Sequence, residues 1–164
     1  MIKRLVLFLS IIFIAGCGFK LRGYVEMPTA FNNIAIVIRG AHQDLGPMLK
    51  DSLQGYKIHV TDNPSQASYL LILEKDTTQQ QITGVGASTT PRQYLLIYTA
   101  QYSLLKPGGE KVITSRTVTS SRQLTVNNNR ILGSDAEEAM LYHEMRQDAV
   151  RQIIFQLSQL KFNQ

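Results

Sequence analysis

Cysteine is nearly absent from this sequence: Cys17 is the only one among 164 residues. A monomer with one thiol cannot form an internal disulfide, so non-covalent packing has to hold the fold together. Tryptophan is absent, and no apolar run after Cys17 approaches the roughly 20 residues that a membrane-spanning helix needs. These absences exclude a disulfide-stabilised scaffold and a helical membrane span after residue 17.

Recognisable catalytic and metal-binding motifs are also missing. His42, His59 and His143 stand in no zinc-ligand spacing, and no G-x-S-x-G nucleophile elbow is present. The Gly-Val-Gly run at 84–86 is too short for a phosphate loop and is typical of a plain turn. We therefore expect a protein that is not an enzyme, with no catalytic residues, no metal, no cofactor and no nucleic-acid partner.

The start of the chain has the features of a secretory signal. A basic head at residues 3–4 precedes an apolar run at 5–14 that is too short to span a bilayer. The run ends in Ile-Ala-Gly-Cys at 14–17, the pattern of a lipobox, whose small residues give a peptidase access to the backbone. We predict that residues 1–16 are removed and that Cys17 is acylated. The alternative is an ordinary signal peptide with an incidental cysteine.

The residue after the cysteine bears on the destination of the chain. It is Gly18, whereas an aspartate there resembles an inner-membrane retention signal, so we expect the periplasmic side of the outer membrane. A single acyl chain binds a membrane only marginally, and the bacterial lipoprotein pattern implies three. The mature chain then consists of a lead-in at 17–32 and one domain at 33–164, long enough for a hydrophobic core.

Hydrophobic periodicity predicts an α+β fold. The segments expected to form strands are 34–38, 69–82, 93–105 and 111–126. The segment 57–61 is either a further strand or part of a longer connection. A short helix is expected with Pro47 in its first turn and Gly55 at its end. A long C-terminal helix is expected to begin at Ser134, which fits a capping box with Glu137.

Acidic residues are scarce in the middle of the chain. Between Thr77 and Ser134 the only acid is Glu110. The basic residues of the same stretch are Arg92, Lys106, Lys111, Arg116, Arg122 and Arg130. Because the guanidinium group matches the geometry of phosphate and carboxylate, this imbalance favours a surface that binds anions. The alternative is a solvated basic face without a ligand.

The expected hairpin gathers some of these charges. If its strands pair around the Pro-Gly-Gly turn at 107–109, position 94 lies roughly opposite position 122. The residues that then lie towards one end of the sheet are Arg92, Arg122 and Arg130. Lys106 and Lys111 lie at the other end. The hairpin therefore predicts one arginine-rich end.

Two strand segments are polar on both faces. They are Lys75–Gln81 and Ser115–Gln123. Such segments suit a hydrophobic core poorly, because each face would bury polar groups. They suit strand ends that project into water or into the polar lumen of a membrane β-barrel.

Four short motifs occur in order along the chain. They are Cys17–Gly23 (CGFKLRG), Gly46–Met48, Arg92–Tyr94 and Glu144–Asp148. Together they resemble the lipopolysaccharide-assembly lipoprotein family LptE over nearly the whole chain, and the first is the most specific. The resemblance implies a mixed sheet of about four strands backed by two helices.

The resemblance also implies a function. LptE sits largely inside the lumen of the outer-membrane β-barrel LptD, acts as a plug, assists assembly of the barrel and binds lipopolysaccharide. The family's basic contacts lie near the loop before the long strand and near the start of the last helix, where Arg92 and Arg130 stand here. With Arg122, these are the candidate residues for binding the lipid A phosphates. The alternative is a structural lipoprotein that braces another outer-membrane complex.

Overall fold

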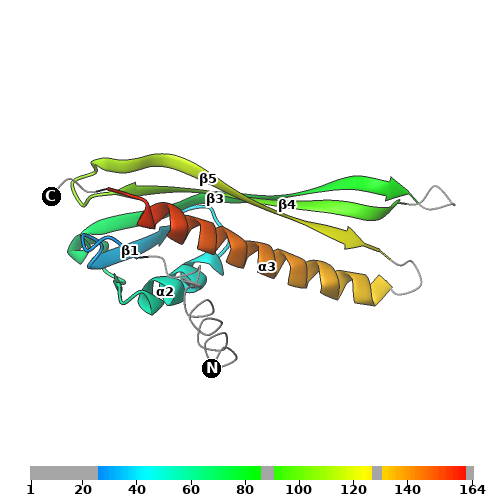
Figure 1. Ribbon diagram of the computed structural model, residues 1–164, viewed down its shortest axis with the longest axis horizontal. Coiled ribbons are helices and arrows are strands. Elements are labelled where there is room, and N and C mark those ends of the chain that lie inside the picture. The colour runs from blue at the N-terminus through cyan, green and yellow to red at the C-terminus, as the bar shows by residue number, and fades with distance from the viewer. Residues whose placement is uncertain (1–25, 86–90, 127–130, 162–164) are drawn as a thin grey trace, which may run out of the picture.

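The computed structural model describes residues 26–85, 91–126 and 131–161 (Figure 1). In chain order the elements are β1 (Asn33–Ile38), α2 (Leu45–Gly55), β2 (His59–Thr61), the short 3₁₀ helix η1 (Pro64–Gln66), β3 (Tyr69–Val85), β4 (Pro91–Leu105), β5 (Lys111–Thr125) and α3 (Ile131–Ser158). The predicted α+β class is confirmed. No helix in this part of the chain combines the length and apolar character that crossing a membrane requires.

The strands form one mixed sheet in the order β2-β1-β3-β4-β5. β1 pairs in parallel with both β2 and β3, whereas β3, β4 and β5 pair antiparallel. The segment 57–61, which the sequence left open, contributes the three-residue edge strand β2. The sheet therefore has five strands where the resemblance implied about four.

The strand β4 shows why these residues form a sheet. Its alternate side chains are buried, as expected for a strand with one face against a core. They are Leu96, Tyr98, Ala100, Tyr102 and Leu104. Both α2 and α3 lie against this face of the sheet (Figure 1), so the molecule has one layer of helices and one layer of strands.

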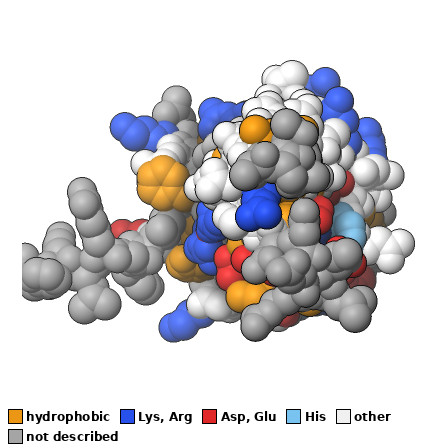
Figure 2. All heavy atoms as spheres, turned by 90° about the vertical axis from the view of Figure 1, so that its right-hand side faces the viewer, with side chains coloured by type: hydrophobic (Ala, Val, Ile, Leu, Met, Phe, Trp, Pro, Cys, Tyr) orange, Lys and Arg blue, Asp and Glu red, His pale blue; other side chains and the backbone are white. Residues whose placement is uncertain are grey.

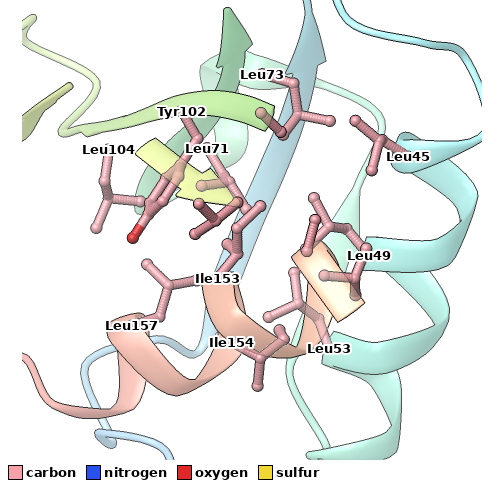
Figure 3. Close-up of a cluster of buried hydrophobic side chains, with 14 of the residues drawn as sticks. Leu45, Leu49, Leu53, Leu71, Leu73, Tyr102, Leu104, Ile153, Ile154 and Leu157 are labelled. Atoms are coloured by element: carbon pink, nitrogen blue, oxygen red, sulfur yellow. The ribbon is translucent and has the colours of Figure 1, made fainter. Parts of the chain in front are cut away.

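The hydrophobic core lies where α2, α3 and the sheet meet (Figure 3). α2 contributes Leu45, Leu49 and Leu53, which share one helix face and are fully buried. Opposite them lie leucines of β3 and the last turns of α3, with Ile153 and Leu157 also fully buried. Each such side chain contributes roughly 1.5–3 kcal/mol of transfer free energy.

Past the end of β1, the sheet narrows to the three strands β3, β4 and β5. The last residue of β3 that pairs with β1 is Leu73, and β5 is the terminal strand of the sheet. We call residues 75–85, 91–101 and 116–125 the arm, and the remainder of the sheet with α2 the base. The helix-facing side chains of β4 and β5 in the arm still belong to the hydrophobic core. The first half of α3 lies along the arm (Figure 1).

Register shifts on both sides of β4 mark the boundary between base and arm. On β3 the pairing skips Glu74, and on β5 it shifts between the partners of Tyr102 and Leu104. The Glu74 carboxylate accepts a hydrogen bond of 2.8 Å from the Ser115 hydroxyl. Hydrogen bonds from Ser115 and Ser103 outweigh the effect of burial and hold the Glu74 pKa below its usual value.

These shifts correct the expected hairpin register. Leu105 pairs with Lys111, as a turn at 107–109 predicts, but Tyr94 pairs with Leu124 and Leu96 with Arg122. The prediction that position 94 lies roughly opposite 122 is therefore off by two residues. Its error comes from the irregularities next to the turn, which place extra residues in β5 and move every later pair along the strand.

The start of the last helix is a second correction. α3 begins at Ile131, so Ser134 already lies inside the helix and does not occupy the capping position. A capping box needs its serine in the non-helical residue before the first turn. The expected pairing of Ser134 with Glu137 as a cap is therefore wrong, although the long helix itself is confirmed.

Candidate functional site

The two predicted arginines that the structure describes both lie in the arm. Arg92 is exposed near the start of β4, and its carbonyl oxygen accepts a 2.8 Å hydrogen bond from the Val126 N–H. Arg122 lies on β5 opposite Leu96. Lys111 pairs with Leu105 beside the turn at the far end of the hairpin. The hairpin thus separates the described basic residues into two groups, as the sequence indicates.

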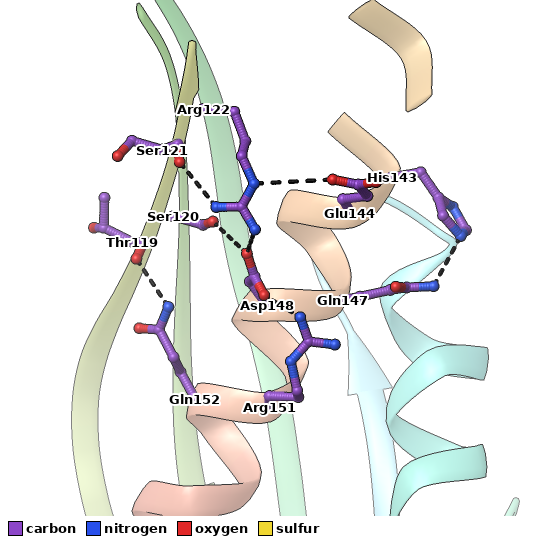
Figure 4. Close-up of polar contacts among 10 residues, drawn as sticks. All are labelled: Thr119, Ser120, Ser121, Arg122, His143, Glu144, Gln147, Asp148, Arg151 and Gln152. Carbon is purple, nitrogen blue, oxygen red and sulfur yellow. Dashed lines mark hydrogen bonds and ion pairs between the residues drawn. The ribbon is translucent and has the colours of Figure 1, made fainter. Parts of the chain in front are cut away.

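Arg122 is not an isolated cation (Figure 4). Its side chain is 36% exposed, and its Nη2 forms an ion pair with Asp148 Oδ2 on α3. Its Nε lies 3.9 Å from Glu144 Oε2, one helical turn away, and its Nη1 donates to the Ser121 carbonyl at 2.9 Å. The guanidinium group therefore bridges the terminal strand and the last helix.

Asp148 is the centre of these contacts. Besides Arg122 it accepts a 3.1 Å hydrogen bond from the Ser120 hydroxyl, and its Oδ1 pairs with Arg151 Nη2. Burial raises the pKa of Asp148, but the hydrogen bonds from Arg151 and Ser120 and the charges of both arginines outweigh it. Its pKa is therefore lowered, and the group is a carboxylate at neutral pH. We call the contacts of Ser120, Arg122, Glu144, Asp148 and Arg151 the seam.

The acidic residues of α3 lie near the basic residues of the arm, which a count of charges along the sequence does not show. α3 places the acids that the middle of the chain lacks alongside the arm (Figure 1). They are Asp135, Glu137, Glu138, Glu144 and Asp148. Figure 2 views the molecule from the arm end and shows Lys and Arg side chains interspersed with Asp and Glu. Among the described residues, the arm end is a mixed charged surface on which Arg122 is paired with acids of α3.

A second polar cluster lies at the root of the arm. The Tyr98 hydroxyl donates to Asp76 Oδ2 at 2.6 Å, and the backbone N–H of His42 donates to Asp76 Oδ1 at 3.1 Å. Burial and the neighbouring Asp76 raise the pKa of Tyr98 well above its usual value. The guanidinium of Arg146, on α3, approaches Asp44 Oδ2 at 3.6 Å. These contacts connect the start of α2, β3, β4 and α3.

Sequence reasoning missed most of this cluster. His42 Nδ1 and Asp44 Oδ2 lie 3.4 Å apart, and both side chains are half exposed. Asp76 and Arg146 carried no motif or spacing that singled them out. Their partners are far away in the sequence, so only the folded chain reveals the cluster.

Side chains that bind metal ions are not gathered in the part that the structure describes. No group of three His, Cys, Asp or Glu side chains there is placed to hold a metal ion. An open hollow of about 270 Å³ lies between α2 and α3, with Met48 and Val150 in its lining and Asp51 and Arg151 beside them. The side chains that line this hollow offer apolar, polar and charged contacts to a partner or ligand.

The family profile described as "LptE: Lipopolysaccharide-assembly" matches residues 26–157. The chain belongs to the LptE family. The match includes all five strands and α3 as far as Leu157. It confirms the resemblance that the four short motifs carry.

Relatives of this LptE-family chain agree with the assignment. The LPS-assembly lipoprotein LptE of Pectobacterium atrosepticum is 26% identical over 155 residues, which cover 93% of this chain and 83% of that protein. A lipoprotein B of Nitrosomonas europaea, solved by NMR, has a TM-score of 0.70 at 26% identity and covers 86% of this chain and 90% of its own. A minor lipoprotein of Acinetobacter baumannii shares the fold, with a TM-score of 0.66 at 21% identity over 80% of this chain and 93% of its own.

Two of the expected site residues lie outside the described part of this LptE-family chain. They are Cys17, which also precedes the matched range, and Arg130. Acylation of Cys17 stays a prediction, as do the lipopolysaccharide contacts of Arg92, Arg122 and Arg130. The structure adds that Arg122 already has carboxylate partners within its own chain.

Proposed function

We propose that this LptE-family chain is an outer-membrane lipoprotein that works in lipopolysaccharide assembly as the plug of an LptD-type β-barrel. Acyl chains on Cys17 anchor it on the periplasmic side, and the domain lies largely within the barrel lumen. The family match and the name of the Pectobacterium relative support the role in lipopolysaccharide assembly. The plug role rests on one observation, the polar arm.

The arm presents polar side chains and unpaired backbone together. From Thr77 to Gln81 every side chain of β3 is exposed and uncharged. Within the described residues, no strand pairs with the outer edge of β5 or with the β1-side edge of β3 after Leu73. Backbone groups at such edges need water or a partner. A wet lumen lined by polar side chains supplies both, which supports the arm as the part that enters a barrel.

The arginines of the arm support lipopolysaccharide as ligand. Arg92 is exposed, and charge-assisted hydrogen bonds from guanidinium groups suit the phosphates of lipid A. Arg122 and Arg130 complete the proposed contact residues. Binding of single molecules at the arm would compete with their packing against one another and keep them available for transport to the surface.

Co-purification tests the partner. The full acylated protein is extracted from outer membranes in detergent, and the proteins that come with it are identified. We expect a large LptD-type barrel. Gln79→Lys with Gln81→Lys on the arm should reduce its recovery, whereas Gln54→Lys, an exposed site on α2, should not. Recovery of a different outer-membrane complex would support the alternative, a lipoprotein that braces that complex.

Direct binding tests the ligand. Purified full-length protein is titrated with lipopolysaccharide at fixed salt. Arg92→Ala with Arg130→Ala should weaken binding by about tenfold or more, because two charge-assisted contacts are lost. Lys106→Ala, at the other end of the hairpin, is the matched control and should leave affinity unchanged. Equal affinity of the double variant and the native chain would show that the site assignment is wrong.

A further inference from the structure

The ion pair between Arg122 and Asp148 has an unusual property: Asp148 does not depend on it. Asp148 holds three side-chain donors, namely Arg122, Arg151 and the Ser120 hydroxyl. Removing one member of a partly buried ion pair is costly when the other charge is left without a partner. Here the carboxylate keeps a cation and a hydroxyl after Arg122 has left.

The position of Arg122 allows its side chain to rotate away from α3. It lies on β5, the terminal strand of the sheet, with 36% of its side chain exposed. Glu144 is a weak second partner, since the closest atoms are 3.9 Å apart and its side chain is 41% exposed. Rotation of the side chain away from α3 therefore breaks the ion pair with Asp148 and the hydrogen bond to the Ser121 carbonyl, and it leaves Glu144 to water.

We infer that Glu144 and Asp148 are specificity-determining residues, which hold Arg122 on α3 until a phosphate displaces them. The inference rests on the proposed lipopolysaccharide binding and adds a rule about which ligands Arg122 accepts. Arg122 contacts ligand only in its released position, while Arg151 and Ser120 keep Asp148 satisfied.

The chemistry selects the ligand class. A ligand carboxylate that takes Arg122 from Asp148 exchanges one carboxylate contact for another and gains little. A phosphate monoester carries up to two negative charges and three acceptor oxygens, and it matches the guanidinium fork with two parallel hydrogen bonds. Glu144 and Asp148 therefore disfavour singly charged ligands and leave Arg122 to a glycolipid that bears phosphate monoesters.

The experiment compares carboxylate variants in the full-length protein in detergent, with lipid A and dephosphorylated lipid A as probes. Asp148→Asn weakens the hold on Arg122 and should raise the affinity for lipid A on the order of tenfold. Glu144→Gln should raise it less, in keeping with the longer contact. Glu137→Gln removes the same charge from an exposed position on the same helix outside the seam, and should change affinity less than about twofold.

A double variant assigns the effect to the arginine. Asp148→Asn with Arg122→Gln should lose the whole gain, and dephosphorylated lipid A should show no gain with any variant. Equal gains from Asp148→Asn and Glu137→Gln, or a gain that persists without Arg122, would overturn the inference while lipopolysaccharide binding stands. If neither the native chain nor any variant binds lipid A, the proposed function fails, and the inference with it.

Discussion

The base and the arm share strands β3, β4 and β5, but they differ in how much of each strand is buried against the helices. In the base, Leu71 and Leu73 of β3 are fully buried against α2 and the end of α3. In the arm, β3 contributes no buried side chain, whereas β4 and β5 still bury apolar side chains such as Leu96 and Leu124, and the seam adds charged and hydroxyl contacts between β5 and α3. β3 thus passes from a buried to an exposed environment at the register shift near Glu74, whereas β4 and β5 keep one apolar face and add polar contacts to α3.

This difference teaches how stability and binding divide between the two regions. Apolar burial stabilises without directional requirements, so the base determines the fold. Hydrogen-bonded ion pairs near the surface contribute less, and they can exchange one partner for another. The arm therefore combines an apolar face against α3 with exposed polar groups that are able to meet a barrel wall or a phosphate.

The largest expected effect is in the base. Ile153→Ala removes a fully buried side chain that packs against Leu71 and should lower the free energy of unfolding by about 3 kcal/mol. Ile82→Ala in the arm is the matched control, because that side chain is 60% exposed, and it should cost less than about 0.5 kcal/mol. Denaturant unfolding measures both. Similar losses would remove the distinction between base and arm.

A smaller effect is expected at the root of the arm. Tyr98→Phe deletes the hydroxyl that donates to Asp76 and leaves that carboxylate with the His42 N–H alone, at a cost of about 1.5 kcal/mol. Tyr94→Phe is the control, since its hydroxyl contacts no other described residue, and it should be nearly neutral. Thermal unfolding compares the two. If both variants behave alike, the Asp76 hydrogen bond does not stabilise the root.

The contribution of the seam to the free energy of unfolding should depend on pH. The Asp148 pKa is lower in the folded chain than in the unfolded one, so folding favours the carboxylate. Its contribution is complete above the ordinary aspartate pKa of about 3.9 and is lost as pH falls through the lower folded value. We expect a loss of about 1 kcal/mol in acid, measured by urea unfolding at several pH values. Asp148→Asn should remove this part of the pH dependence; an unchanged profile would contradict the assignment.

The smallest effect is expected at the exposed lysine beside the hairpin turn. Lys106 pairs with Glu110 at 3.0 Å, but both side chains are largely in water. Lys106→Met should lower the free energy of unfolding by about 0.3 kcal/mol, because exposed pairs are screened. The reverse removal, Glu110→Gln, should match it within error. If either variant lost more than about 1 kcal/mol, the exposed ion pair would be a substantial source of stability in the base. That result would contradict the view that apolar burial is what stabilises the base.

Several features of the fold and site followed from local patterns. The alternation of β4 and the leucine spacing of α2 predict which faces are buried, because each pattern repeats with the geometry of its own element. The turn at 107–109 predicts the register beside it, where Leu105 faces Lys111. The polar character of 75–81 predicts a strand that leaves the core, and these side chains are largely exposed.

Other features were decided by contacts that no local pattern contains. The irregularities between Tyr102 and Leu105 shifted the hairpin register, and the start of α3 at Ile131 displaced the expected cap. The excess of basic over acidic residues in the middle of the chain appears when charges are counted along the sequence. In space, Asp148 lies against Arg122, although 26 residues separate them in the sequence.

The sequence by itself determined the element order, the buried faces of strands and helices, the predicted lipid attachment at Cys17 and the motifs of the LptE family. Each of these depends on neighbours a few residues apart, whose relation the backbone geometry prescribes. Only the tertiary structure decided that β1 lies between β2 and β3, and that the carboxylates of α3 hold Arg122. Strand order and ion pairing depend on which distant segments share a surface, and that is known only when the apolar faces have been buried together.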